Sequence, residues 1–259
     1  SRTTLYTNIF RTFDLISDAF DIRGLRHVIR PEVVYLRRFP VTYLHGRTAA
    51  TTPQFDEIDV PVGVYDAVSF YLTTSLEGLR TDTRMGGDRI VDVLKLRGEV
   101  TLFPRQARDN DGALLGPMIW SFDLQPQDWI RFHADLRYDF KIGEITRYGV
   151  GGSLRIRIDQ RDAMLLEVSH RVVRNVSTIS RFRVAWAPSD VYRVDTAFEY
   201  DFESEVVRNV NFAVQRLFQE FALTFRVDRD FIRNDTAFFF TFAPLGFGDN
   251  PDIFRSTRQ

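Results

Sequence analysis

Residues 129–140 read WIRFHADLRYDF, and this stretch decides the fold. Apolar side chains occupy the even positions from Ile130 to Phe140, and charged or imidazole side chains occupy the odd positions from Arg131 to Asp139. Because successive side chains on a β-strand point to opposite faces, this alternation predicts a strand with one apolar and one charged face. Helical spacing does not fit it.

The same two-residue period recurs in residues 150–159 and 191–201. The alternating segments run for roughly 10–14 residues, whereas strands of globular proteins usually have about 5–6. Tight breaks at Pro126 and Pro188 separate some of them. Long strands with one apolar face, joined by short turns, are typical of a membrane-spanning barrel. The predicted fold class is therefore all-β, an antiparallel transmembrane β-barrel.

Thirteen strands are predicted, at about residues 3–13, 24–38, 66–80, 89–103, 117–125, 129–140, 145–159, 163–174, 178–187, 191–202, 206–217, 219–228 and 234–243. Single-chain bacterial barrels have even strand numbers. We therefore expect residues 1–248 to form a partial barrel wall, the C-terminal portion of a larger barrel, with a tail at 249–259. The strand at 3–13 is not expected to pair fully with the strand at 234–243.

The lengths of the connections predict which end of the barrel is which. Strands alternate in direction, so the long connections at 39–65 and 104–116 fall at one end, and the turns at Pro126 and Pro188 fall at the other. In outer-membrane barrels the long loops are external and the short turns periplasmic.

Composition excludes several function classes. The net charge of −1 argues against a nucleic-acid partner, and the absence of cysteine excludes disulfides and CxxC metal sites. The chain contains no GxSxG, HExxH, P-loop or dinucleotide-binding motif, so we expect no enzyme activity, cofactor or metal. The glycines from Gly149 to Gly152 are expected to let bulky neighbours approach the strand rather than to bind phosphate.

All but two of the 34 basic residues are arginines, and many fall on the charged strand faces. We predict an interior lined by Arg131, His133, Asp135, Arg137, Arg155, Arg157, Arg181, Arg183, Arg193, Asp195 and Glu199. The apolar side chains of Phe132, Leu136, Leu154, Ile156, Phe198 and Phe212 are predicted to face outward. A lipid-facing arginine at the bilayer midplane would cost about 2–4 kcal/mol.

Four segments resemble the family of the LPS-assembly protein LptD, also called the organic solvent tolerance protein. Residues 26–35 resemble its His-x-x-x-Pro-x-x-x-Tyr strand, and residues 53–59 its Pro-x-Phe-Asp-x-x-Asp segment. Residues 75–80 resemble a strand end followed by a turn, and residues 238–248 resemble the closing strand. The order and spacing of the four segments match the family.

The resemblance implies transport of lipopolysaccharide (LPS) to the outer leaflet of a Gram-negative outer membrane, without bond chemistry. It further implies an LptE-like lipoprotein plug inside the barrel, and an N-terminal domain that joins a periplasmic LPS-transport bridge. Lipid would leave through a lateral gate between the first and last strands, which places Thr236, Phe238, Phe240 and Phe242 at the gate. The interior arginines would contact LPS or the plug. Unlike many members of the family, this chain has no cysteines.

Two other readings stay open. A passive outer-membrane porin or substrate-specific channel would share the alternating strands. A soluble all-β binding module would pack its apolar faces against a second sheet.

Overall fold

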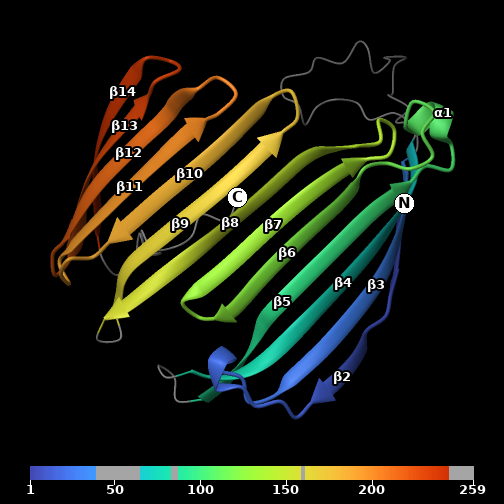
Figure 1. The fold of residues 1–259 in the computed structure, drawn as a ribbon, viewed down its shortest axis with the longest axis horizontal. Helices are drawn as coiled ribbons and strands as arrows, with labels where there is room; N and C mark the ends of the chain where they lie inside the picture. The colour runs from blue at the N-terminus through green and yellow to red at the C-terminus, as the bar shows by residue number, and fades with distance from the viewer. Residues whose placement is uncertain (39–64, 83–86, 159–160, 245–259) are drawn as a thin grey trace, which may run out of the picture.

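The computed structural model describes residues 1–38, 65–82, 87–158 and 161–244, which form one curved antiparallel sheet (Figure 1). The sheet has fourteen strands, and from β3 onward each strand pairs with the next strand along the chain. No helix in the described ranges is long and apolar enough to cross a membrane. Fourteen strands and two short helical segments make the described part of the chain all-β.

The strands occupy every segment that the alternating pattern predicts. They are β1 (Arg2–Tyr6), β2 (Ile9–Phe13), β3 (Leu25–Arg38), β4 (Tyr65–Asp82), β5 (Gly87–Leu102), β6 (Met118–Gln127), β7 (Ile130–Asp139), β8 (Glu144–Ile158), β9 (Arg161–Val173), β10 (Ser177–Trp186), β11 (Tyr192–Asp201), β12 (Val206–Leu217), β13 (Phe221–Asp230) and β14 (Asp235–Pro244). Two short helical segments, η1 (Asp18–Phe20) and α1 (Gln106–Asp109), lie in connections.

The predicted strand at 3–13 is divided into β1 and β2. Both pair with β3 in one continuous register, in which Tyr6 faces Glu32 and Ile9 faces Ile29. The interruption falls opposite Pro31, whose nitrogen carries no hydrogen for the ladder. The amide of Thr7 still donates to the Pro31 carbonyl at 3.3 Å. A proline on the partner strand thus accounts for the fourteenth strand.

The register defines two faces of the sheet. Phe132, Val168, Phe182 and Phe198 occupy successive cross-strand positions with Gly152, and we call this side the outer face. The opposite side, which we call the inner face, carries the charged positions. All six side chains predicted to point outward share the outer face, namely Phe132, Leu136, Leu154, Ile156, Phe198 and Phe212.

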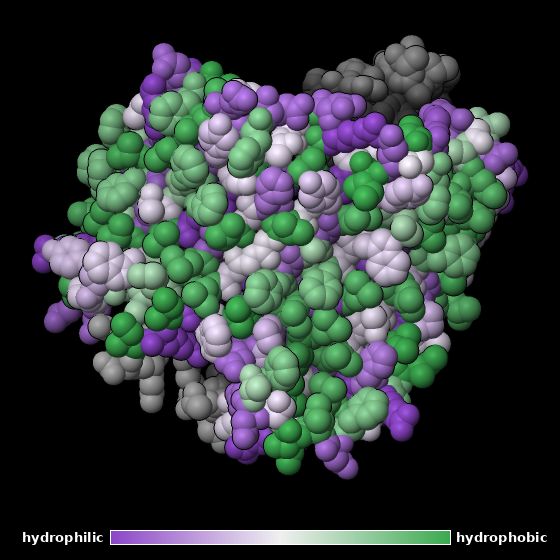
Figure 2. Space-filling view, in the orientation of Figure 1, coloured by the Kyte–Doolittle hydropathy of each residue, from purple (hydrophilic) through white to green (hydrophobic). Residues whose placement is uncertain are grey.

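The inner face is the more buried of the two. Many of its covered residues are small, such as Ala185 at 0% exposure, and Leu165 is a larger aliphatic residue among them. On the outer face, Phe182 remains 47% exposed. Figure 2 shows hydrophobic residues over much of the middle of the molecule. Among the described residues no second sheet packs on these side chains, which excludes a sandwich for this part of the chain.

The two ends of the sheet differ in their connections. The β5–β6 connection, which contains α1, lies at the end opposite the β6–β7 and β10–β11 turns (Figure 1). This is the arrangement predicted for 104–116, Pro126 and Pro188. The predicted long connection at 39–65 lies almost wholly outside the described residues.

The two edges of the sheet are not joined. In the part of the chain that the structure describes, β14 pairs only with β13, and β1 and β2 pair only with β3. The predicted lack of pairing between the first and last strands is confirmed. Both edges therefore carry backbone groups without a strand partner.

Buried Arg80 ties β4 to the β6–β7 turn. Its guanidinium donates to Asp128 at 3.0 Å and to the carbonyl oxygens of Gln125 and Pro126 at 2.8 and 2.5 Å. Next to it, Ile22 from the β2–β3 connection packs over Gly78, where an added Cβ would lie 3.2 Å from Ile22 Cγ1. These contacts hold the turn end of β4, β5 and β6 together.

Candidate functional site

A nearly covered group of charged side chains on the inner face is centred on Arg183 of β10. Its Nη1 lies 2.9 Å from Glu167 of β9, and its Nε lies 2.8 Å from Asp195 of β11. The register places Glu167 directly opposite Arg183, and Asp195 opposite the neighbouring Ala185. With only 10% of its side chain exposed, Arg183 links three strands through charge-assisted hydrogen bonds.

Other predicted interior residues form similar pairs across strands. Arg131 Nε donates to Asp123 at 3.1 Å, and Arg181 lies 3.6 Å from Glu199. Arg155 and Arg193 also lie on the inner face, opposite Leu165 and Gln215 respectively.

A bulge between Ile156 and Arg157 shifts the register at the last interior position predicted on β8. Apart from that shift, the predicted interior residues share the charged face. The ion pairs of Arg131, Arg181 and Arg183 each join adjacent strands.

The glycines of β8 make room for inner-face side chains, as predicted. An added Cβ on Gly149 would lie 2.6 Å from Asp135 Oδ1, and one on Gly151 would lie 2.5 Å from His133 Cε1. The carboxylate and the imidazole of β7 therefore lie flat across the neighbouring strand. No helix or phosphate-binding loop follows, because both glycines are inside β8.

Sequence reasoning did not single out two basic residues of this region, Arg147 and Arg171. Arg147 of β8 lies directly opposite Arg137 of β7, and its Nη2 donates to Asp135 at 3.0 Å. Arg171 of β9 lies opposite Gly149. Their shared face was readable from strand alternation, but their proximity depends on register.

The edge strand β14 presents aromatic side chains on both faces. Phe238, Phe240 and Phe242 of the predicted gate lie on the outer face, where Phe240 is 76% exposed. Phe239 lies on the inner face and is 48% exposed. Thr236, the fourth predicted gate residue, accepts a hydrogen bond from Arg229 at 2.7 Å. An apolar edge with aromatic groups on both sides suits contact with hydrocarbon.

Aromatic side chains also gather at both ends of the strands. Tyr138 and Phe140 meet edge to face at 5.2 Å between ring centroids, at the end that carries α1. Phe218 and Phe221 stack at 4.4 Å at the other end. Aromatic residues are enriched at both interfaces of a membrane, because their rings are apolar but tolerate polar neighbours.

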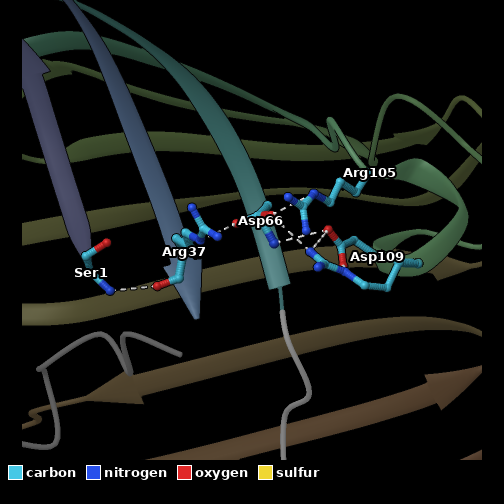
Figure 3. A network of polar contacts seen from close by, with 6 residues as sticks. Ser1, Arg37, Asp66, Arg105 and Asp109 are labelled. Atoms are coloured by element: carbon cyan, nitrogen blue, oxygen red, sulfur yellow. Dashed lines mark hydrogen bonds and ion pairs between the residues drawn. The ribbon is translucent and has the colours of Figure 1, made fainter. Parts of the chain in front are cut away.

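A polar network attaches α1 to the end of β4 (Figure 3). The buried carboxylate of Asp66 lies 3.1 Å from Arg108, 3.4 Å from Arg105 and 3.5 Å from Arg37. Asp109 accepts hydrogen bonds from Arg108 and, at 3.1 Å, from the backbone amide of Asp66. The hydrogen bond from the Arg108 guanidinium holds the pKa of Asp109 below its ordinary value.

Replacing Asp109 by asparagine is expected to loosen α1 from β4. Because the folded-state pKa is lowered, the contribution of Asp109 is present above its unfolded-state pKa of about 3.9 and is lost as the pH falls through the folded value. Hydrogen exchange at the Asp66 amide should be about tenfold faster in Asp109→Asn at pH 7, and the difference should shrink at acidic pH. Asp111→Asn is the control, since Asp111 is 90% exposed and contacts only Lys141 among the described residues. Equal exchange rates in Asp109→Asn and wild type at pH 7 would contradict this role.

Comparisons with known proteins give structural matches but no sequence family. No family model and no curated protein matches the chain. Two solved structures of mutants of the Rh. blastica porin match over 94% of this chain and 90% of theirs, with 11% identity and a TM-score of 0.43. Further mutants of the same porin match with the same coverage, identity and TM-score.

Proposed function

We propose that this chain forms part of the wall of a β-barrel in the outer membrane of a Gram-negative bacterium. The exposed outer face supports this location, since apolar surface removed from water contributes about 25 cal/mol per Å². The inner face supports it too, because its ion-paired arginines and acids suit a water-filled interior.

Within that membrane, the proposed function is transport of LPS to the outer leaflet through a lateral opening of the barrel wall. The observation that carries this proposal is the open edge at β14. An unpaired strand edge in lipid costs several kcal/mol for each orphan backbone group, so the edge needs a strand partner in the complete barrel. Lateral release of LPS would require that this pair of strands can separate. The aromatic groups of β14 offer acyl chains an apolar surface on both sides of that seam.

The proposed partners follow from the two faces. The inner face, with exposed arginines beside small residues, suits a plug protein of the LptE type and the anionic saccharide of LPS. The outer face suits membrane lipids. A connection to a periplasmic LPS-transport bridge through an N-terminal domain completes the proposal.

A photo-crosslinker at Phe239 tests the transport proposal. Phe239 lies on the inner face of the edge strand, where bulk membrane lipid has no access in a closed barrel. With p-benzoylphenylalanine at this position of the full-length protein in growing cells, we expect a crosslink to LPS. The same residue at Ser121, on the inner face of β6 far from the seam, gives the background for lumen positions. A Phe239 signal no stronger than that background would contradict lateral release.

A passive porin is the second candidate function. The cross-strand ion pairs around Arg183, which resemble a charged lining for small solutes, favour it. A porin would give steady single-channel conductance in a planar bilayer and no LPS crosslink at Phe239. A transporter closed by a plug would give the opposite pair of results.

A further inference from the structure

We propose that Arg137, Arg147 and Arg171 form a binding site for a phosphoryl group on the inner face. This inference rests on the proposed function and deepens it, because it names the part of an anionic glycolipid that the wall would hold. The three arginines come from the adjacent strands β7, β8 and β9. The predicted interior set includes only Arg137.

The register places the three arginines at neighbouring positions of the inner face. Arg137 and Arg147 are a directly opposed pair, and Cβ atoms of such pairs lie about 4.5–5.5 Å apart. Arg171 pairs with Gly149, two residues beyond Arg147 on the same face, and is thus a diagonal neighbour of Arg147. Like charges in opposed positions destabilise a sheet unless a counter-ion lies between them.

Among the residues that the structure describes, the acids paired with this group carry less charge than the three arginines. Asp135 is engaged with Arg147 through both Nε and Nη2, at 3.1 and 3.0 Å. Within the described ranges, neither Arg137 nor Arg171 lies within ion-pairing distance of an acid. Arg183, by comparison, forms ion pairs with both Glu167 and Asp195. An anion bound at the three arginines would supply the missing charge.

The surrounding residues leave room for that anion. Gly149 carries no side chain between Arg147 and Arg171, and the Asp135 carboxylate lies flat over it. Bordering inner-face positions include Ile119, opposite Arg137, and Ile179, opposite Arg171. Asp139, two residues beyond Arg137, accepts a hydrogen bond from the Lys141 backbone amide at 2.8 Å. The two isoleucines add no charge, and the Arg147 side chain remains 49% exposed. A ligand in the interior can therefore reach the guanidinium groups.

The number and type of donors favour phosphate over a carboxylate. Each guanidinium presents a planar fork of donors that matches the oxygens of phosphate or carboxylate in pairs. A phosphate monoester offers three oxygens and up to two negative charges. These charges suit Arg137 and Arg171 together with Arg147, whose charge is partly balanced by Asp135. The ligand class we infer is a phosphorylated saccharide.

Calorimetric titration with inorganic phosphate tests the site directly. The full-length protein, in a zwitterionic detergent at low ionic strength, is expected to bind phosphate. The variants Arg137→Gln and Arg171→Gln should each weaken binding about tenfold, the size expected for losing one charge-assisted hydrogen bond, and the double variant more. The control is Arg26→Gln, which removes an inner-face arginine already paired with Glu77, and which should change the affinity less than twofold.

A thermal measurement separates loss of binding from loss of folding. Phosphate should raise the Tm of the wild type and leave that of the double variant unchanged, because a ligand stabilises the state that binds it. Without phosphate, the double variant should melt no lower than the wild type, since its opposed like charges are gone. Absence of phosphate binding by the wild type would overturn the inference, as would an equal loss in Arg26→Gln.

A second crosslinker, at Ile119, identifies the source of the phosphoryl group. A crosslink from this position to LPS in cells would place a glycolipid at the site. Phosphate binding without that crosslink would leave the site intact, assign it to small phosphate anions, and contradict LPS as its ligand. Phosphate binding in detergent does not depend on transport. The phosphate site can therefore be absent even if the Phe239 crosslink to LPS supports lateral release, and the two proposals can fail separately.

Discussion

Replacing Arg183 by alanine is expected to lower the free energy of unfolding by about 3 kcal/mol, because it leaves two acids facing each other without a cation. Arg183 is almost covered and holds Glu167 and Asp195 at 2.9 and 2.8 Å. Urea unfolding of the protein refolded into lipid vesicles, followed by tryptophan fluorescence, measures the change.

Arg181→Ala provides the matched control on the same strand. Its contact with Glu199 is 3.6 Å long and both side chains are about one-third exposed, so the loss should be below about 1 kcal/mol. Neutralising both acids in the Arg183 variant, with Glu167→Gln and Asp195→Asn, should recover most of the stability. If Arg181→Ala and Arg183→Ala lowered the free energy of unfolding equally, burial of the Arg183 ion pairs would contribute nothing to stability.

Replacing Phe198 by arginine is expected to cost about 2–4 kcal/mol in vesicles, because the charge would enter hydrocarbon near the middle of a strand. Phe198 lies on the outer face of β11, with its ring centroid 6.3 Å from that of Phe182, and is 36% exposed. The same vesicle unfolding assay measures the effect.

Asn209→Arg is the control for the added charge itself. Asn209 of β12 is directly opposite Glu199 on the inner face, so the new guanidinium gains an acid at a wet surface. Its expected effect is less than about 1 kcal/mol. A larger cost for Asn209→Arg than for Phe198→Arg would reverse the assignment of the two faces.

The strands and their faces were predictable because alternation is a local property. Residues 129–140 alone indicate the apolar row that includes Phe132 and the charged row that includes Arg131, and the register confirms both. The open edges were expected from an odd count of thirteen strands, whereas the structure has fourteen because the first predicted strand is divided. The role of Gly149 as space for a neighbour also followed, since a glycine inside a strand leaves its position empty.

Features that depend on the partner strand were not predictable. The break between β1 and β2 is caused by Pro31, which is on another strand. The pairing of Arg137 with Arg147 depends on the exact register of β7 and β8, and a one-residue slip would move one of them to the other face. The attachment of α1 to Asp66 joins segments more than 40 residues apart, and no local pattern reports it.

The central claim is that the outer face meets lipid and the inner face meets water, and alternating fluorophore quenching tests it most directly. The chain has no cysteine, so single cysteines at 181, 182, 198 and 199 can each carry one environment-sensitive dye. In vesicles containing lipids brominated on their acyl chains, we predict strong quenching at Phe182→Cys and Phe198→Cys, and weak quenching at Arg181→Cys and Glu199→Cys. Equal quenching at all four positions, or stronger quenching at 181 and 199, would contradict a membrane wall.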